Sequence, residues 1–298
     1  MYLFFKKFPI LFALFILTIN VPVSAKLVEI AALVEMINVM PMSHVYVYRS
    51  GKKLEVVPMM SLQAGDLLHI RQSKNNSLKD KQNYVLLTLG KDESAKITFK
   101  QSPYWVKKRE SPLMIPDNQE LNPIDLFKSI YEKFRKAASM RSVETKSLLI
   151  PLLKNTLTQM VTGERRLHLA WQNRRAPYWV YIFQKNNTIA KLSSTKRVLF
   201  AKQKWQPGHY PIEISDANGN KDQGIFQVLN KLPFQFQKME QEIQASTLPE
   251  WAKQTLFAAW LTQQENGMWK LEAYQRVVGI ANKYQPALLV KKDLENME

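Results

Sequence analysis

Four histidines and a complete lack of cysteine set narrow limits on the chemistry of this 298-residue chain. The histidines are His44, His69, His168 and His209, and none pairs with another histidine at the spacing of a metal site. Without cysteine there is no thiol nucleophile, no thiolate-bound zinc or iron–sulfur cluster, and no disulfide. The sequence has no phosphate-loop, dinucleotide or nucleophile-elbow motif. We therefore expect no catalytic, metal or cofactor site.

Aromatic and basic residues next to each other indicate a second kind of chemistry, which is binding. Trp171 and Trp179 flank the pair Arg174-Arg175. Exposed, these residues would form a platform for an anionic polymer or nucleic acid. Buried, Trp171 would be a core residue of a β-structure, and its place in an alternating run favours this reading. The positions of Trp179 and Trp205 stay open.

The positive charge of the chain is concentrated in its middle third. The chain has 42 Lys and Arg against 25 Asp and Glu, a net charge of +17, and residues 128–204 contain 17 basic and 3 acidic residues. Such a segment attracts acidic partners if its charges share one side, and otherwise only solvates the surface. The candidate contacts for an anionic partner are Lys133, Arg135, Lys136, Arg165, Arg166, Arg174, Arg175, Lys196 and Arg197. Arg174 and Arg175 are expected to be exposed at a turn.

The first 25 residues have the pattern of a secretory signal. Lys6 and Lys7 precede an apolar run over 8–19, and small residues end at Ala25, the expected cleavage site. The run is shorter than the roughly 20 apolar residues of a spanning helix. An uncleaved anchor is the alternative. We expect a soluble periplasmic or secreted protein, for which nucleic acid is not the physiological partner.

Short alternating runs predict strands in the first half of the mature chain. Residues 44–57 form a predicted hairpin around Ser50-Gly51, and residues 84–99 form another around 90–92. Between them, Gly65-Asp66 is a predicted tight turn into a strand. Strands at this spacing predict a small barrel or roll over 26–111.

The rest of the chain divides into a linker, a sandwich and a helical segment. Residues 112–163 are a predicted linker with an amphipathic helix that starts at Asn122-Pro123. Residues 164–230 read as short strands and turns, which favours a β-sandwich. Residues 231–298 predict a helical hairpin, with a capping box at Thr247 and Glu250 and a stop at Asn266-Gly267. The fold class is therefore mainly β with α.

Two segments resemble known families. The stretch from about 44 to 110 resembles the FecR-like domain of bacterial envelope proteins, through the hairpin at Ser50-Gly51 and the run Leu62-Gln63-Ala64-Gly65-Asp66-Leu67-Leu68. Residues 164–229 are similar to the Ig-like segments that follow such domains, through the runs 167–171, 176–178, 207–210 and 216–219. The resemblance implies an envelope binding or assembly module and not a catalyst.

These observations give three hypotheses of function. The first is a non-enzymatic exported protein that binds or scaffolds another envelope component. The second is a binder of anionic surface polymer, such as lipopolysaccharide or polysaccharide, through the basic middle third, and a peripheral contact with the membrane is compatible with both. The third and least favoured is a hydrolase built on carboxylates, because residues 128–204 contain only 3 acidic residues.

Overall fold

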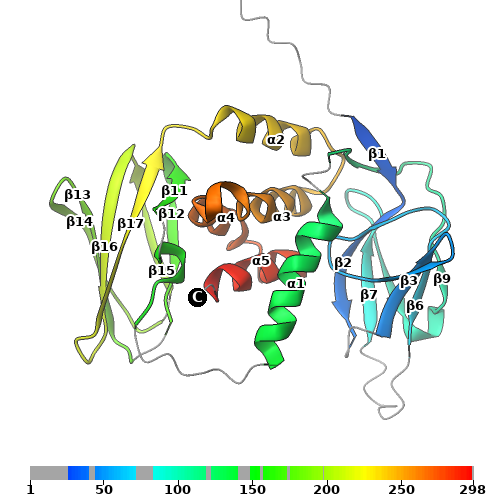
Figure 1. Cartoon of the computed structure of the whole chain (residues 1–298), viewed down its shortest axis with the longest axis horizontal. Coiled ribbons are helices and arrows are strands. Elements are labelled where there is room, and N and C mark those ends of the chain that lie inside the picture. The colour runs from blue at the N-terminus through cyan, green and yellow to red at the C-terminus, as the bar shows by residue number, and fades with distance from the viewer. Residues whose placement is uncertain are drawn as a thin grey trace, which may run out of the picture.

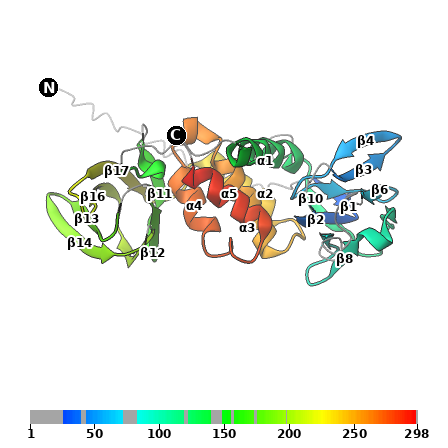
Figure 2. The same ribbon diagram turned by 90° about the horizontal axis from the view of Figure 1, so that it is seen from below.

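The computed structural model describes residues 26–39, 44–71, 83–118, 122–139, 148–154, 157–172, 175–196 and 198–296. The predicted signal segment and its cleavage site at Ala25 lie outside these residues. Strands gather at the two ends of an elongated molecule, and the C-terminal helices lie between them (Figures 1 and 2). The expected fold class, mainly β with α, is confirmed at this level.

The N-terminal β-unit consists of two antiparallel four-stranded sheets. One has the order β5-β2-β7-β8 and the other the order β4-β3-β6-β9, and in the described residues neither closes into the barrel considered above. The strands are β2 (Ala32–Asn38), β3 (Val45–Arg49), β4 (Lys52–Glu55), β5 (Ser61–Leu62), β6 (Leu67–Ile70), β7 (Tyr84–Thr88), β8 (Ser94–Thr98) and β9 (Tyr104–Trp105).

Both predicted hairpins of this unit are present. β3 pairs with β4 across a turn in which Ser50 and Gly51 have φ values of 48° and 76°, the geometry that two-residue hairpin turns favour. β7 pairs with β8 at the second predicted site. β2 lies at the centre of its sheet, between β5 and β7, and was not predicted as a strand. Its sequence is almost continuously apolar and lacks the alternation that revealed the other strands.

The Gly65-Asp66 turn holds a buried ion pair as well as a bend. Gly65 has a φ of 92°, which favours glycine. The Asp66 side chain is 2% exposed and accepts hydrogen bonds from Nε and Nη2 of Arg49, at 3.0 and 2.6 Å. It also accepts one from the Gln63 amide. The turn therefore ties β3 to the start of β6, a role that the spacing of Gly and Asp did not reveal.

One strand pair and one helix lead from the N-terminal β-unit toward the C-terminal helices. β1 (Leu27–Ile30) and β10 (Leu113–Pro116) form a separate antiparallel pair. Helix α1 (Pro123–Ser139) begins with proline at its first position, as predicted. Its buried face includes Phe127 and Ile130, and it packs against α5 and α3. No helix in the described residues is long and apolar enough to span a bilayer.

The second β-unit is a pair of sheets that face each other (Figure 1). Five strands have the order β11-β17-β16-β13-β14, with β11 parallel to β17, and β12 pairs with β15 in the other sheet. The strands are β11 (Thr158–Val161), β12 (Gly163–Ala170), β13 (Tyr178–Gln184), β14 (Asn187–Ser194), β15 (Val198–Trp205), β16 (Gly208–Ser215) and β17 (Lys221–Leu229). β11 precedes residue 164, where the sequence placed the start of this unit.

Aromatic rings fill the space between these sheets. Trp205 from the two-stranded sheet makes edge contacts with Tyr210 and Phe226 of the five-stranded sheet, with ring centroids 5.3 and 5.6 Å apart. Trp171 is 3% exposed and contacts the ring of Tyr178, so the core reading of Trp171 is confirmed. The Tyr210 hydroxyl donates a hydrogen bond back to the Gln206 carbonyl at 2.8 Å, which fixes the corner before β16.

The C-terminal segment forms four helices, where two were predicted individually. They are α2 (Phe234–Gln244), α3 (Glu250–Leu261), α4 (Lys270–Val277) and α5 (Gln285–Glu295). Nine of the twelve residues of α3 are buried, so this helix leaves little free surface for a partner. The predicted capping box is wrong, because Pro249 precedes the helix and the Thr247 hydroxyl accepts a hydrogen bond from the Met114 amide.

Glutamine side chains join the helices to both β-units in the same way. The Gln275 amide group of α4 accepts from the His168 N–H of β12 at 2.8 Å and donates to the His168 carbonyl at 2.9 Å. Gln285 of α5 does the same with the N–H and carbonyl of Ile37 in β2, at 2.7 and 3.2 Å. Each glutamine therefore occupies a stretch of strand edge that would otherwise be unpaired.

Candidate binding surfaces

Within the residues that the structure describes, the predicted basic region is dispersed over several elements. Arg165 turns inward and pairs with Glu272 of α4 at 2.6 Å. Lys133 lies on α1, where its Nζ is 3.7 Å from the Asp293 carboxylate of α5. Arg175 and Lys196 are exposed at other points of the sandwich. Arg174 and Arg197 lie outside the described residues, as do the side chains of Arg135 and Lys136.

Glu272 is the centre of a buried charge network between the helices and the sandwich. Its side chain is 1% exposed and accepts hydrogen bonds from Arg165, Arg276 and the Val161 amide. Arg276 also pairs with Glu240 of α2 at 2.6 Å. Burial alone would raise the pKa of Glu272, but the charges of Arg165 and Arg276 outweigh it and lower the pKa. Each charge of the network faces an opposite charge, although the buried Nε of Arg165 has no hydrogen-bond partner. We assign the network a structural role.

Three cations of the middle third do share one face. Arg166 on β12 lies opposite Lys202 on β15, and Lys204 lies opposite Glu164 in the same sheet. All four are exposed. We call Arg166, Lys202 and Lys204 the basic row. Of these, the sequence analysis had singled out Arg166; the cross-strand register, which the sequence does not give, brings the two lysines beside it.

His168 adds no charge to the basic row at neutral pH. It lies two positions after Arg166 on the same face of β12. Burial, and then the charge of Arg166, lower its pKa below the ordinary value for histidine. The neutral imidazole is therefore the dominant form at pH 7.

An aromatic stripe runs along the outer face of the five-stranded sheet. Val180 and Ile182 of β13 point into the core, so alternation places Trp179, Tyr181 and Phe183 on the opposite face, where all three are half-buried. The rings of Tyr181 and Phe183 stack with centroids 6.5 Å apart. Lys191 of β14 lies over the Tyr181 ring at 5.4 Å. We call Trp179, Tyr181 and Phe183 the β13 stripe.

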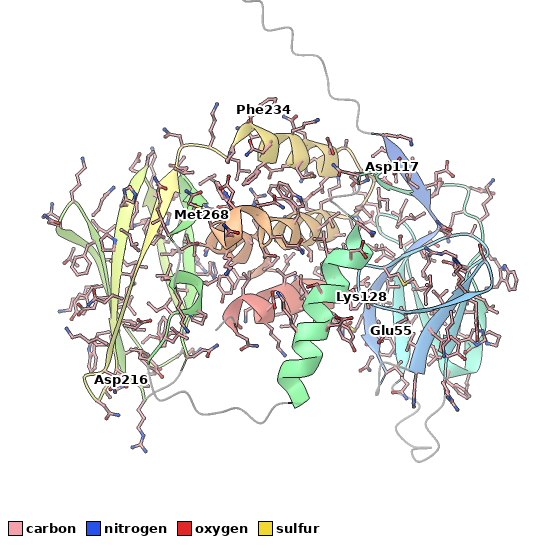
Figure 3. The ribbon with its side chains drawn as sticks, viewed as in Figure 1. Glu55, Asp117, Lys128, Asp216, Phe234 and Met268 are labelled. Atoms are coloured by element: carbon pink, nitrogen blue, oxygen red, sulfur yellow. The ribbon has the colours of Figure 1, made fainter. Side chains whose placement is uncertain are left out.

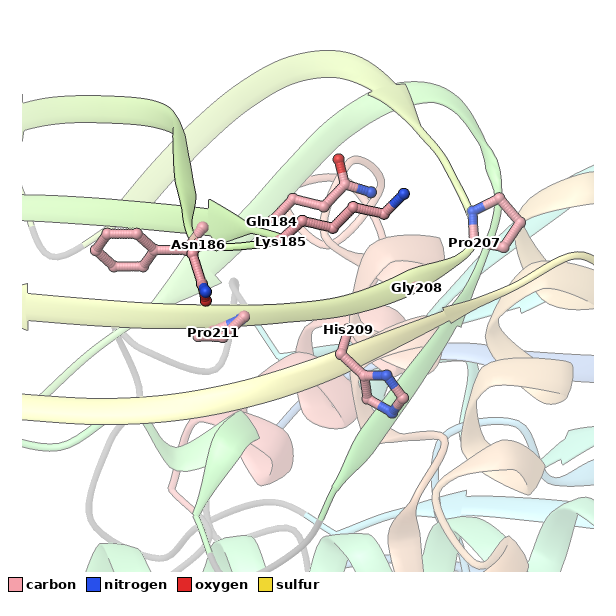
Figure 4. A pocket seen from close by; sticks show the side chains of 8 residues that line it. Gln184, Lys185, Asn186, Pro207, Gly208, His209 and Pro211 are labelled. Carbon is pink, nitrogen blue, oxygen red and sulfur yellow. The ribbon is translucent and has the colours of Figure 1, made fainter.

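The β13 stripe ends at an open pocket of about 660 Å³. Its walls come from the β13–β14 turn and from the start of β16, which Figure 4 shows side by side. Lys185 and His209 supply the titratable groups, and Phe183 is shared with the stripe. The Gln184 amide donates to the Tyr210 hydroxyl at 2.8 Å and so ties the two walls together.

The turn that carries Lys185 has an uncommon backbone. Lys185 and Asn186 have φ values of 47° and 64°. Asparagine tolerates this left-handed region, whereas a long side chain such as lysine is seldom found in it. The geometry is that of a two-residue hairpin turn, as at Ser50-Gly51, because Gln184 pairs with Asn187 across it. The sequence did not mark Lys185 or His209 as site residues. Trp179 was the one residue of this face that it weighed for binding, and its position stayed open.

A smaller cavity lies between the N-terminal β-unit and α1. It has a volume of about 190 Å³, and Val57, Met60 and Tyr131 form its apolar lining. Glu55 and Lys128 lie on its two sides (Figure 3). Opposite charges at the mouth of an apolar crevice are compatible with simple packing between two elements, and we assign no binding role to it.

No family model matches the chain, and no curated protein matches it. In the described residues, no group of three or more histidine or acidic side chains is placed to hold a metal ion. What the surfaces can do chemically must therefore be argued from their own residues: the β13 stripe offers aromatic contact area, and its pocket offers a cation and an imidazole.

Proposed function

We propose that this chain is a non-enzymatic exported protein that binds or scaffolds another component of the bacterial envelope. The proposal combines the signal-like pattern of residues 1–25 with a structure built from two β-units around a helical centre. Mass spectrometry of the protein from its host should find an N-terminus at Lys26. An intact, membrane-embedded Met1 would contradict cleavage and favour the anchor.

The proposal includes an Ig-like assignment for the second β-unit. Its support is the strand order, with β11 parallel to β17 at the edge of the five-stranded sheet and β12 paired with β15 opposite. The hydrogen bond from Tyr210 to the Gln206 carbonyl has the geometry of the tyrosine corner of Ig-type sandwiches. For the N-terminal unit, the FecR-like assignment rests on the Gly65-Asp66 turn and the strands around it.

The observation that carries the binding proposal is the β13 stripe with its adjoining pocket. Aromatic side chains that stay partly exposed on a rigid sheet supply much of the affinity at protein interfaces, because they offer large contact areas at small entropic cost. Here the sheet fixes three of them in a row beside Lys185 and His209. We propose this surface as the contact with the envelope partner.

Capture from envelope extract tests this surface. The double variant Trp179→Ala/Tyr181→Ala should lose the proteins or polymers that the parent retains, while circular dichroism shows the fold to be kept. Phe234→Ala is the matched control, because it removes an exposed ring from the start of α2, outside the five-stranded sheet. Equal capture by the parent and the double variant would refute the assignment of the partner to the β13 stripe.

The basic row supports a second candidate function, the binding of an anionic surface polymer. Arg166, Lys202 and Lys204 are exposed together on the two-stranded sheet, with Glu164 as the one acidic residue among them. Lys202→Glu/Lys204→Glu should abolish retention on immobilised lipopolysaccharide, and retention by the parent should fall between 50 and 200 mM salt, where the Debye length shortens. Lys238→Glu/Lys283→Glu is the charge-matched control, because both lysines are exposed outside the basic row. This function would be ruled out if retention changed neither with salt nor with the charge reversal at Lys202 and Lys204.

A further inference from the structure

The outer face of the sheet β4-β3-β6-β9 has an aromatic surface unrelated to the β13 stripe. Alternation in β3 and β6 sends Val47 and Leu68 into the core, where both are fully buried. The same alternation leaves aromatic and apolar side chains on the outer side. We call this set the N-terminal aromatic face, and its members are Tyr46, Tyr48, Leu67, His69 and Trp105.

Part of this face is a tightly packed ring cluster. Tyr46 and His69 are cross-strand partners with parallel rings 5.0 Å apart, and Tyr48 makes edge contacts with both. Lys53 lies over the other side of the Tyr46 ring at 4.1 Å. Because the cluster is held from several directions, it forms a firm base for the side chains next to it.

The other part is an exposed apolar row. Tyr48, Leu67 and Trp105 lie directly opposite one another on three neighbouring strands. Tyr48 is 38% exposed and Trp105 is 60% exposed. A tryptophan this exposed next to a leucine and a tyrosine is unfavourable in water, and contiguous apolar surface of this kind marks a site of interaction.

The charges around the row are predominantly positive. Lys53 lies opposite Tyr48, and Lys107 and Lys108 follow Trp105 after the buried Val106, so exposed cations lie at both ends of the row. The arginines nearby are already committed: Arg49 pairs with Asp66 and Arg109 pairs with Glu93. The exposed acidic residues nearest the row are Glu55 and Glu110.

We propose that the N-terminal aromatic face docks on the surface of an anionic phospholipid bilayer. Trp and Tyr are the side chains that prefer the headgroup region of a membrane, because their rings are apolar and their N–H or O–H groups are polar. Lysines at both ends of an apolar row match a layer of anionic headgroups above an apolar interior. The combination of an apolar row with lysines at both ends favours a bilayer over an acidic protein. The charged surface of an acidic protein would match the lysines but not the apolar row.

Docking in this way would leave the other surfaces free. The N-terminal β-unit and the sandwich lie at opposite ends of the molecule, with the helices between them (Figure 1). A membrane-bound protein would therefore hold the β13 stripe and the basic row away from the bilayer. The proposal is independent of which partner those surfaces bind.

Vesicle sedimentation tests the proposal. Protein isolated from its host is mixed with vesicles of phosphatidylcholine alone or with 30% phosphatidylglycerol. We expect binding to the anionic vesicles, a drop of about tenfold or more for Trp105→Ala, and about fivefold for each of Lys107→Gln and Lys108→Gln. Phe234→Ala is the aromatic control, because Phe234 is 79% exposed at the start of α2, away from this sheet (Figure 3). Lys238→Gln/Lys283→Gln is the charge control, because both lysines are exposed on the helical segment.

A second measurement reports on Trp105 itself. Brominated lipids should quench part of the tryptophan fluorescence of the parent, and Trp105→Phe should remove that quenched part while the protein stays bound. The proposal fails if anionic vesicles do not bind the protein or if both control variants weaken binding as strongly as the test variants. It also fails if Trp105 is not quenched, or if the face proves to hold a soluble protein or glycan and no vesicle.

Discussion

Replacing Glu272 should lower the free energy of unfolding more than replacing any exposed acidic residue. Glu272→Ala removes the buried carboxylate that Arg165 and Arg276 share at the contact between the sandwich and the helices. The arginine side chains are 25% and 21% exposed, and Arg276 keeps another acidic partner, Glu240. Removing one partner of a buried ion pair typically costs about 3–5 kcal/mol, because the remaining charge has lost its solvation and its partner. We expect a loss of that size at pH 7, measured by urea unfolding followed by circular dichroism.

The control for this prediction is the same substitution at the surface. Glu213 pairs with Lys221 at 2.9 Å, but the side chains are 30% and 59% exposed. Glu213→Ala should therefore cost about 0–1 kcal/mol. Equal losses for the two variants, or a loss below about 1 kcal/mol for Glu272→Ala, would refute the structural role of the buried network.

The pH dependence gives an independent check. The pKa of Glu272 is lowered in the folded protein, so its contribution is complete above the unfolded value of about 4.3 and is lost as the pH falls through the folded value. Arg165 and Arg276 stay charged throughout, and Glu240 faces Arg276 from α2. The difference in unfolding free energy between parent and Glu272→Gln should therefore be largest at neutral pH and shrink below about pH 4. A constant difference would contradict this assignment.

Three further predictions concern the cores. Trp171→Ala should cost about 3–5 kcal/mol in urea unfolding, because the side chain is 3% exposed; an unchanged midpoint would contradict its burial. Gly224→Ala should cost about 1–3 kcal/mol, since a Cβ there would lie 2.5 Å from the Leu153 Cβ; a melting temperature equal to that of the parent in calorimetry would contradict this. Asp66→Asn should cost about 1.5–3 kcal/mol by weakening the charged hydrogen bonds from Arg49; thermal unfolding unchanged from the parent would refute this.

The parts of the fold that sequence predicted correctly are those determined by neighbours along the chain. The turn at Ser50-Gly51, the proline start of α1 and the burial of Trp171 each follow from a short pattern of residues. β11 was missed because it becomes a strand by pairing in parallel with β17, far along the chain. The capping box failed for a related reason: Thr247 satisfies the distant Met114 amide instead of its own helix.

The binding surfaces show the same division. The sequence left the position of Trp179 open, and the structure places it on the face of β13 opposite the core residues Val180 and Ile182. The sequence could not show that Arg165 is neutralised, since Glu272 lies 107 residues away. Nor could it place Lys202 beside Arg166, which depends on the register of β15 against β12. Charge counted along a chain therefore overestimated the charge available at any one surface.

The two glutamine contacts also have a consequence for how this chain reaches its native state. Gln285 closes the edge of β2 at Ile37 across 248 residues, and Gln275 closes the edge of β12 at His168 across 107. Contacts this distant in sequence form late and slow the folding of a domain. Until the last helices are available, both β-units carry an open strand edge, which is the feature through which unfinished chains aggregate. A chain that emerges from its N-terminus first would thus depend on protection of these two edges until its final helices arrive.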